Sequence, residues 1–275
     1  MSNNNRKIYK PPISNFSMAL KLNTLGETYQ EFYGRNIEQM PKLIADGRVP
    51  MNAAQLMQRR LDVRNSDDKI KSSYMDNYFD TGDAVVYNPD GRVKIVLDSQ
   101  NLRDMTPKSP RNAGALILGE EVYNALEGEE FKKGKLGKTN IQMSKADVKV
   151  HPVLKVLARD QGLLNDYADY IFAEAKERLG YTENMGVYVD SPSEVTKLRA
   201  WFFDGLECRS IVDGRYYLDC SYGRFVGLAP EAPQKISGKV KVVRPNLEQV
   251  LSLANQYIPP IVQEQFKEEV KKLYQ

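Results

Sequence analysis

One segment of this chain, residues 202–225, differs sharply in composition from the rest and reads FFDGLECRSIVDGRYYLDCSYGRF. Six of its 24 residues are aromatic, compared with 9% of the whole chain, and it contains no Lys, Gln or Met. Both cysteines of the protein, Cys208 and Cys220, lie in it. Protein cores favour Leu, Ile and Val, and solvated faces favour Lys and Glu. The segment instead has the composition of a recognition surface, in which stiff aromatic rings and small polar residues make the contacts.

The bulk composition indicates a globular protein. The chain has 275 residues, which suffices to bury a core, and its 41% hydrophobic and 27% charged content is ordinary. A net charge of +3 without a concentrated basic patch argues against a nucleic-acid partner. The sequence has no apolar run long enough to insert into a membrane and no signal-peptide core at its start. We therefore expect a cytoplasmic protein, or a component of a virion that is assembled inside a cell.

The sequence offers little material for catalysis or metal binding. It contains one histidine, His151, and its two cysteines are twelve residues apart, so neither a zinc spacing nor a histidine cluster is present. No nucleophile motif accompanies His151, which precedes Pro152 at a predicted helix start and is expected to be structural. Two cysteines in an intracellular chain are expected to be unbridged. We predict that the protein is not an enzyme and holds no metal or cofactor.

The hydrophobic pattern predicts a mixed α/β architecture. Residues 83–87 and 92–97 flank Asn-Pro-Asp-Gly, which predicts a β-hairpin. An apolar stripe over residues 163–179, followed by Gly180, predicts an amphipathic helix with a glycine at its C-terminal end. A second, shorter apolar face predicts a helix from Asn52 to Asp62. Short apolar runs predict strands at residues 115–118, 185–189, 198–202 and 225–229.

Three regions are predicted along the chain. Residues 1–80 form an N-terminal arm and helical segment, of which residues 1 to about 40 are expected to be a loose arm. Residues 81–235 form the main domain, which carries the binding segment 202–225. Residues 236–275 form a C-terminal helical extension, with helices after Pro245 and from Ile261 onward.

The motifs Leu198-Arg199-Ala200-Trp201, Arg209-Ser210 and Gly223 to Ala232 resemble a known family. They are similar to the variable proteins of diversity-generating retroelements, in particular archaeal ones, which have a C-type-lectin fold. The resemblance implies an α+β, C-type-lectin-like fold of the formylglycine-generating-enzyme type, with extra N-terminal and C-terminal helices. In that family a reverse transcriptase writes changes at adenines, so an AAY codon reaches Phe, Tyr, Cys, Ser, Asp, Gly, Arg, Ile, Val or Leu. Glu207 is the only residue of the segment outside that set.

The resemblance also implies which residues face inward and which face a ligand. Trp201, Leu206, Leu218, Val226 and Leu228 are expected to be buried scaffold, and Arg209 and Ser210 to bind loop carbonyls. The partner is unknown and is expected to be a macromolecule, in the first place a protein. Tyr216, Tyr217, Tyr222 and Arg215 are expected to be the best anchors, because Tyr and Arg dominate binding hot spots. The predicted ligand-binding surface consists of Phe203, Asp204, Gly205, Cys208, Ile211, Val212, Asp213, Gly214, Arg215, Tyr216, Tyr217, Asp219, Cys220, Ser221 and Tyr222.

Three alternatives remain open at the level of the sequence. The same fold could be a structural part of a virion or another large assembly, without diversification. It could be an enzyme of the formylglycine-generating type, in which Cys208 and Cys220 would be the reactive thiols; such thiols need a depressed pKa. The segment could also be a tyrosine-rich loop of a β-rich domain that is not diversified.

Overall fold

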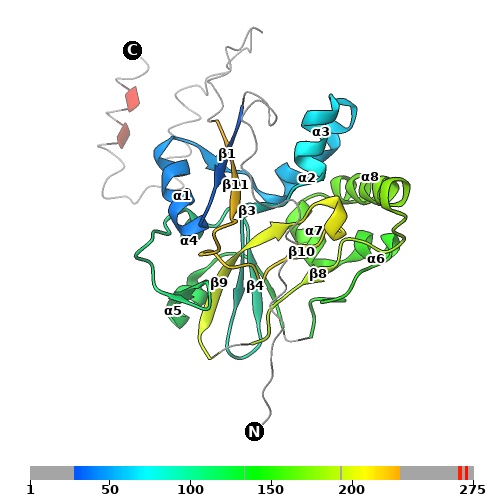
Figure 1. Ribbon diagram of the computed structural model, residues 1–275. Coiled ribbons are helices and arrows are strands. Elements are labelled where there is room, and N and C mark those ends of the chain that lie inside the picture. Colours follow the sequence, from blue (N-terminus) through cyan, green and yellow to red (C-terminus); the bar gives the residue numbers. More distant parts are fainter. Residues whose placement is uncertain (1–27, 133, 193, 230–265, 268–269, 272–275) are drawn as a thin grey trace. The chain divides into compact units, whose positions relative to one another are not determined.

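The computed structural model of the protein describes residues 28–132, 134–192, 194–229, 266–267 and 270–271 (Figure 1). The chain divides into two compact units, residues 1–230 and 231–275. In the second unit the described residues are helical. The rest of the predicted C-terminal helices, and the first 27 residues of the predicted arm, lie outside the described residues.

The first unit is built on a mixed β-sheet. Along its main path the strand order is β1-β11-β3-β9-β10-β8, with antiparallel pairing except between β3 and β11 and between β8 and β10. Shorter strands extend it: β2 pairs with β11, β4 with β3, β7 with β4, and the β5–β6 hairpin with β9. The strands are β1 (Tyr29–Tyr33), β2 (Val49–Pro50), β3 (Phe79–Tyr87), β4 (Val93–Val96), β5 (Arg111–Asn112), β6 (Ala115–Leu118), β7 (Glu129–Phe131), β8 (Val187–Tyr188), β9 (Thr196–Phe203), β10 (Val212–Asp213) and β11 (Arg224–Leu228).

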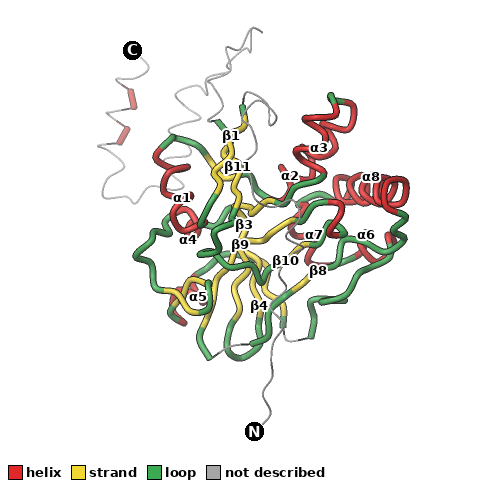
Figure 2. The backbone as a smooth tube through the Cα atoms, viewed as in Figure 1, coloured by secondary structure: helices red, strands yellow, loops and turns green. Residues whose placement is uncertain are grey.

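Helices cover both faces of this sheet, so its central strands are buried on both sides (Figure 2). One core cluster joins α2, α6, α7 and α8 to one face, and the other joins α1, α4 and α5 to the opposite face. Successive residues of β3 alternate between the two clusters, as the period of a strand requires. The helices are α1 (Asn36–Ala45), α2 (Ala53–Asp62), α3 (Asp68–Met75), α4 (Gln100–Arg103), α5 (Glu120–Ala125), α6 (Lys145–Val150), α7 (Pro152–Ala158) and α8 (Gln161–Leu179).

The helices predicted at residues 52–62 and 163–179 are confirmed, and so is Gly180 at the end of the second. Asn52 caps α2 in a reciprocal capping box with Gln55. The longer helix, α8, begins at Gln161 behind its cap Asp160 and ends at Gly180, which has a φ of 71°. The apolar stripes of both helices are buried against the sheet, so burial of one face holds them in place.

The predicted hairpin is also confirmed, as β3 and β4. Gly91 has a φ of 89° and donates its N–H to the carbonyl of Asn88 at 2.9 Å. Asp90 accepts the N–H of Arg92. Residues other than glycine rarely adopt a positive φ of this size, so Gly91 permits the tight turn.

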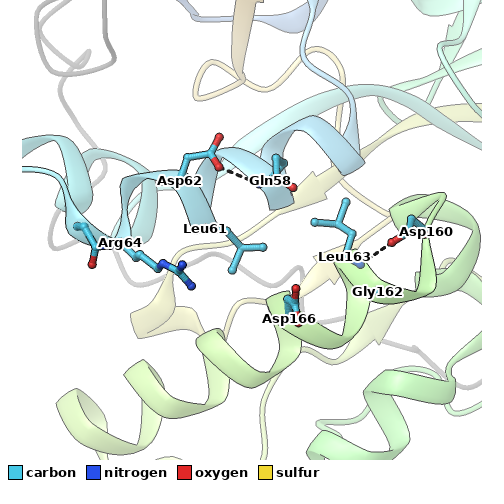
Figure 3. Close-up of a pocket in the computed structure, with 9 residues that line it drawn as sticks. Gln58, Leu61, Asp62, Arg64, Asp160, Gly162, Leu163 and Asp166 are labelled. Carbon is cyan, nitrogen blue, oxygen red and sulfur yellow. Dashed lines mark hydrogen bonds between the residues drawn. The ribbon is translucent and has the colours of Figure 1, made fainter.

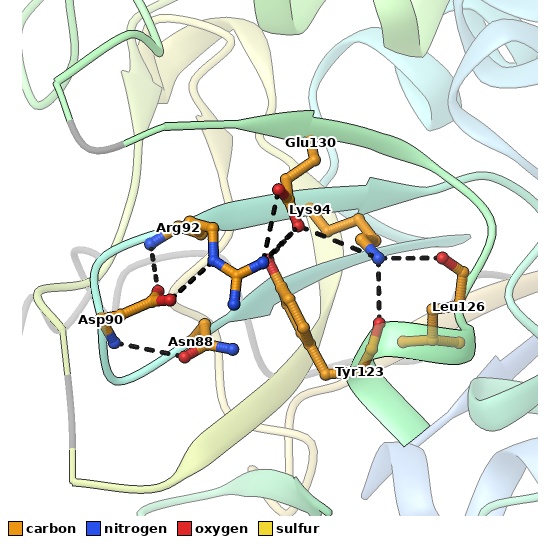
Figure 4. Close-up of polar contacts among 7 residues, drawn as sticks. All are labelled: Asn88, Asp90, Arg92, Lys94, Tyr123, Leu126 and Glu130. Carbon is orange, nitrogen blue, oxygen red and sulfur yellow. Dashed lines mark hydrogen bonds and ion pairs between the residues drawn. The ribbon is translucent and has the colours of Figure 1, made fainter. Parts of the chain in front are cut away.

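Charged residues of the hairpin hold the next part of the chain against the sheet (Figure 4). The ammonium group of Lys94 donates to the carbonyls of Tyr123 and Leu126 at the end of α5, each at 2.9 Å. Arg92 pairs with Glu130 of β7 at 3.2 Å. A cation at the C-terminal end of a helix satisfies carbonyls that have no partner within the helix. This arrangement ties α5 and β7 to the hairpin.

The predicted N-terminal region is wrong in two respects. Residues 28–40 are not a loose arm, because β1 pairs with β11 over five residues and α1 packs on the sheet. The predicted boundary near residue 80 has no counterpart, since β1, α1 and α2 belong to the same unit as β3 to β11. The pairing of β1 with β11 joins residues almost 200 positions apart, so no local signal in the sequence indicates it. Within β1 only Phe32 is classed as buried, which gives a weak strand pattern.

His151 has the structural role that the sequence predicted. It occupies the N-cap position of α7 next to Pro152, although its side chain makes no capping hydrogen bond there. The imidazole is buried, and its Nε2 lies 2.8 Å from the carbonyl oxygen of Lys138. Burial lowers the pKa of the imidazole. This residue therefore anchors the 137–139 stretch to α7.

Candidate binding surface

The segment 202–225 divides into a buried first half and a more exposed second half. It runs from the end of β9 through a short 3-10 turn at residues 206–208 and β10 to the start of β11. The expectation that all fifteen candidate residues face outward is wrong for seven of them. These seven are buried: Phe203, Asp204, Gly205, Ile211, Val212, Asp213 and Gly214.

Strand pairing at the centre of the molecule explains their burial. Phe203 of β9 lies opposite Val212 of β10, and both side chains belong to the core that α8 covers. Asp204 donates its N–H to the carbonyl of Ile211 at 2.8 Å. Gly214 lies so close to Tyr87 that a Cβ atom there would be 2.6 Å from the tyrosine oxygen. These residues therefore belong to the scaffold beneath the surface.

The exposed part is the loop of residues 215–222, which we call the display loop. Tyr217 and Tyr222 have 39% and 49% of their surface exposed, and Ser221 is exposed as well. Arg215, Tyr216, Asp219 and Cys220 are partly exposed. Cys208 is partly exposed too, but it lies in the 3-10 turn rather than in the display loop.

Backbone hydrogen bonds to other elements fix the display loop. Leu218, whose side chain is buried, donates its N–H to the carbonyl of Gly114 at 2.8 Å. Its own carbonyl accepts the N–H of Ile37 at 3.1 Å. The carbonyl of Gly223, directly after the loop, accepts the N–H of Gly34 at 2.9 Å. The loop is thus held between the β5–β6 turn and the connection from β1 to α1.

Two arginines from outside the loop bind further carbonyls of its backbone. Arg199 donates to the carbonyl of Tyr216 at 3.1 Å, and Arg35 donates to the carbonyl of Asp219 at 3.2 Å. Charge-assisted hydrogen bonds of this kind are stronger than neutral ones. The main chain of the display loop is therefore fixed by contacts that do not depend on which side chains the loop carries.

Tyr216 differs from the other two tyrosines of the loop. Its ring stacks on Phe202 with the centroids 4.5 Å apart, and Phe202 stacks in turn on Tyr78 at 5.2 Å. Its hydroxyl lies 3.4 Å from the Sγ of Cys220. Burial raises the pKa of the Tyr216 hydroxyl. Tyr216 therefore supports the loop from within, unlike Tyr217 and Tyr222.

The predicted scaffold residues lie where the sequence placed them. Trp201, Leu206, Leu218 and Val226 are buried, and Leu228 is partly buried. Arg209, which was expected to bind a loop carbonyl, donates to the carbonyl of Glu183 at 3.0 Å. The same expectation is wrong for Ser210, which is buried but whose hydroxyl makes no hydrogen bond.

Two buried carboxyl groups lie close to this scaffold. Asp80 of β3 accepts the N–H of Arg224 at 2.8 Å, and Asp204 accepts the N–H of Gly205 at 2.9 Å. Burial raises the pKa of both carboxyls to about 7, and the hydrogen bonds oppose the shift only in part. Each group therefore holds its proton in the folded chain at a pH where it is ionised in the unfolded chain.

This difference gives stability a defined pH dependence. Because the folded pKa lies above the unfolded one, stability is expected to fall as the pH rises from about 4 to about 8. Between pH 6 and pH 8 each carboxyl should lower the free energy of unfolding by about 1 kcal/mol. Urea unfolding at these two pH values, with Asp80→Asn and Asp204→Asn, measures the effect. Each Asn variant should lose its share of the pH dependence, and an unchanged dependence in both variants would contradict the expectation.

A cleft lies between the end of α2 and the start of α8 (Figure 3). It has a volume of about 490 Å³ and includes Leu61, Asp62, Asp160 and Leu163 in its lining. Asp160 caps α8 by accepting the N–H of Leu163, and Asp62 accepts a hydrogen bond from Gln58. These polar groups serve the helices themselves, so we do not assign a ligand to the cleft.

Within the described ranges the chain shows no arrangement for metal chemistry. No three His, Cys, Asp or Glu side chains there are grouped so that they could hold a metal ion. Both cysteines are free thiols. Among the helices that the structure describes, none has the length and apolar character needed to cross a membrane.

A solved structure shares this architecture. It comes from work on the accommodation of massive sequence variation in Nanoarchaeota by the C-type lectin fold. The superposition has a TM-score of 0.56 and covers 76% of this chain and 100% of the solved one, at 15% sequence identity. The chain has a C-type lectin fold. No protein-family model matches the sequence, and no curated protein matches it. The fold predicted from residues 198–232 is confirmed.

Proposed function

We propose that this protein binds a macromolecular ligand, in the first place another protein, through a variable surface on its C-type lectin scaffold. We further propose that it is the target of a diversity-generating retroelement of the archaeal type, and that it is not an enzyme. One observation carries the proposal. The main chain of the display loop is fixed by other elements, while the side chains of Tyr217, Ser221 and Tyr222 are exposed.

This arrangement is what a diversified binding site requires. Substitutions of exposed side chains usually change stability by only about 0.5 kcal/mol in either direction. Hydrogen bonds made by the backbone of the display loop persist when its side chains are replaced. A loop that is already ordered also loses little conformational entropy when a ligand binds. The surface can therefore change its chemistry without unfolding the domain.

The residues that the display loop carries support the same proposal. Arg215, Tyr217, Asp219, Cys220 and Ser221 are all reachable from an AAY codon by changes at adenines, and so is Tyr222. Tyr and Arg are also the residues most often found at binding hot spots. Composition and exposure thus favour the same set of positions.

Sequencing the locus in several isolates tests the proposal. We expect differences concentrated at adenine-derived codons for positions 215, 217, 219, 220, 221 and 222. We expect constancy at Phe203, Val212 and the other buried candidates. Differences spread evenly along the gene would overturn the proposal and favour a structural component of a virion or assembly. Constancy of Cys208, Cys220 and their neighbours would favour the alternative that the protein is an enzyme with reactive thiols.

A pair of displayed libraries tests the capacity of the scaffold directly. In the first, the six positions 215, 217, 219, 220, 221 and 222 are randomised; in the matched control, six of the buried candidates are. The first library should remain mostly folded and yield binders to a chosen soluble protein such as lysozyme, and the control should be mostly unfolded. Equal loss of folding in both libraries would rule out the display loop as a surface that tolerates variation.

The enzyme alternative has less support from the geometry. The single histidine of the chain is held at the start of α7 by the carbonyl of Lys138. We therefore do not assign it as a base for either thiol. Alkylation of Cys208, which lies in the 3-10 turn outside the display loop, should leave the fold and any binding by Tyr217 and Tyr222 in place.

A further inference from the structure

The structure contains a buried arginine directly beneath the display loop. Arg199 lies on β9 opposite Val85 of β3 and is 1% exposed. Its guanidinium donates to the carbonyl of Tyr216 at 3.1 Å and to the carbonyl of Ala113 at 2.7 Å. A single side chain thus joins the display loop to the β5–β6 turn.

We propose that Arg199 is a positioning residue of the binding surface, which fixes the direction in which residue 217 is presented. This inference rests on the proposed function for its biological meaning. The geometry that it invokes is independent of any ligand.

Residue 217 is bracketed on both sides by bonds to the same turn. On one side Arg199 links the carbonyl of Tyr216 to that of Ala113. On the other side the N–H of Leu218 reaches the carbonyl of Gly114 at 2.8 Å. Two successive carbonyls of the turn therefore hold the two neighbours of residue 217, whatever side chain it carries.

The surroundings of Tyr217 also leave room for a large side chain at this position. Its ring lies over the Arg199 guanidinium, with 4.8 Å between the Arg Cζ and the ring centroid. A Cβ atom on Gly114, which has a φ of 71°, would lie 2.6 Å from the Cβ of Tyr217. The absence of a side chain at position 114 therefore leaves room for the side chain at 217. An aromatic residue there gains a cation–π contact as well.

Arginine is suited to this role for a physical reason. Burial of the charged guanidinium costs free energy, because the group loses its hydration. Three acceptors offset that cost: the carbonyls of Tyr216 and Ala113, and the Asp190 carboxylate 3.7 Å away. The planar guanidinium binds two acceptors in a fixed geometry, whereas a lysine ammonium is a single point charge. Arg199→Lys should therefore keep the charge but lose the rigid link between the loop and the turn.

The test compares Arg199→Lys with Arg60→Lys by amide hydrogen exchange. Arg60 is a matched control, because it is also 1% exposed and donates to backbone carbonyls, those of Tyr74, Asn77 and Asp204, all outside the display loop. Arg199→Lys should raise the exchange rate of the Leu218 amide about tenfold or more relative to the amide of Val226 in β11. Arg60→Lys should leave that ratio within about threefold of the unsubstituted protein, even if it lowers the melting temperature equally.

A second variant keeps the test decisive if Arg199→Lys does not fold. Tyr217→Ala removes an exposed ring and leaves both carbonyl bonds of Arg199 in place, so the exchange ratio at Leu218 should change by less than about threefold. The proposal is overturned if Tyr217→Ala frees the Leu218 amide about tenfold, because the loop would then be held by its own side chain. It is also overturned if Arg199→Lys leaves the ratio unchanged or if Arg60→Lys raises it equally. None of these measurements uses a ligand. Failure of this inference can therefore be distinguished from failure of the proposed function, which the sequences of the isolates test.

Discussion

Replacing Trp201 by Ala is expected to lower the free energy of unfolding by about 3 to 5 kcal/mol. Trp201 is fully buried on β9 and belongs to the core cluster that includes Val85, Tyr87 and Val212. Removing the indole takes away buried apolar surface and leaves a cavity. The central strands β3 and β9 are covered by helices on both faces, so the surroundings can close around it only in part.

Urea unfolding measures this loss, and a thermal melt should show a decrease of roughly 10 °C. Trp201→Phe is the matched control, because it keeps an aromatic ring in the same place and should cost clearly less than Trp201→Ala. A Trp201→Ala variant that unfolds like the original protein would show that the indole is not part of the core. In that case the assignment of β9 as a strand buried on both faces would be wrong, and with it the division of residues 202–225 into a buried scaffold and an exposed display loop.

Local signals in the sequence identified the elements whose hydrogen bonds or burial are local. The apolar stripe of α8 and its terminal Gly180, the apolar face of α2 and the Asn88-Pro89-Asp90-Gly91 turn were all found where predicted. The motif around Trp201 also led to the correct fold, through its resemblance to proteins of that fold rather than through local propensity. These parts of the structure were predictable.

Pairing between distant strands was not predictable in the same way. The burial of Phe203 and Val212 results from the contact of β10 with β9 and from the cover that α8 provides. Composition could not separate them from the display loop, because Phe, Ile, Val, Asp and Gly are both reachable by adenine changes and compatible with burial. The sequence indicated Arg199 only as part of a motif and did not predict its contacts. Its two carbonyl partners, at residues 113 and 216, come from loops far apart in the sequence.

The two exposed tyrosines of the display loop should separate binding from stability. Tyr217→Ala and Tyr222→Ala are each expected to change the free energy of unfolding by about 1 kcal/mol or less, because their rings are largely outside the core. Each should weaken binding by about 2 kcal/mol, roughly thirtyfold in Kd, as the loss of an aromatic anchor does.

Tyr216→Ala is the internal comparison for this pair, and the structure reverses its expected role. Its ring stacks on Phe202 and is largely covered, so its loss should destabilise the domain by about 1 to 3 kcal/mol, more than either exposed tyrosine. Tyr216→Phe keeps the stacked ring and should restore most of that stability. Thermal melts of the four variants need no ligand, and titration against a partner captured by the unsubstituted protein gives the binding arm. If Tyr217→Ala and Tyr222→Ala unfold the domain while Tyr216→Ala leaves it intact, these rings belong to the core, and the loop cannot vary in the way that a diversified binding surface must.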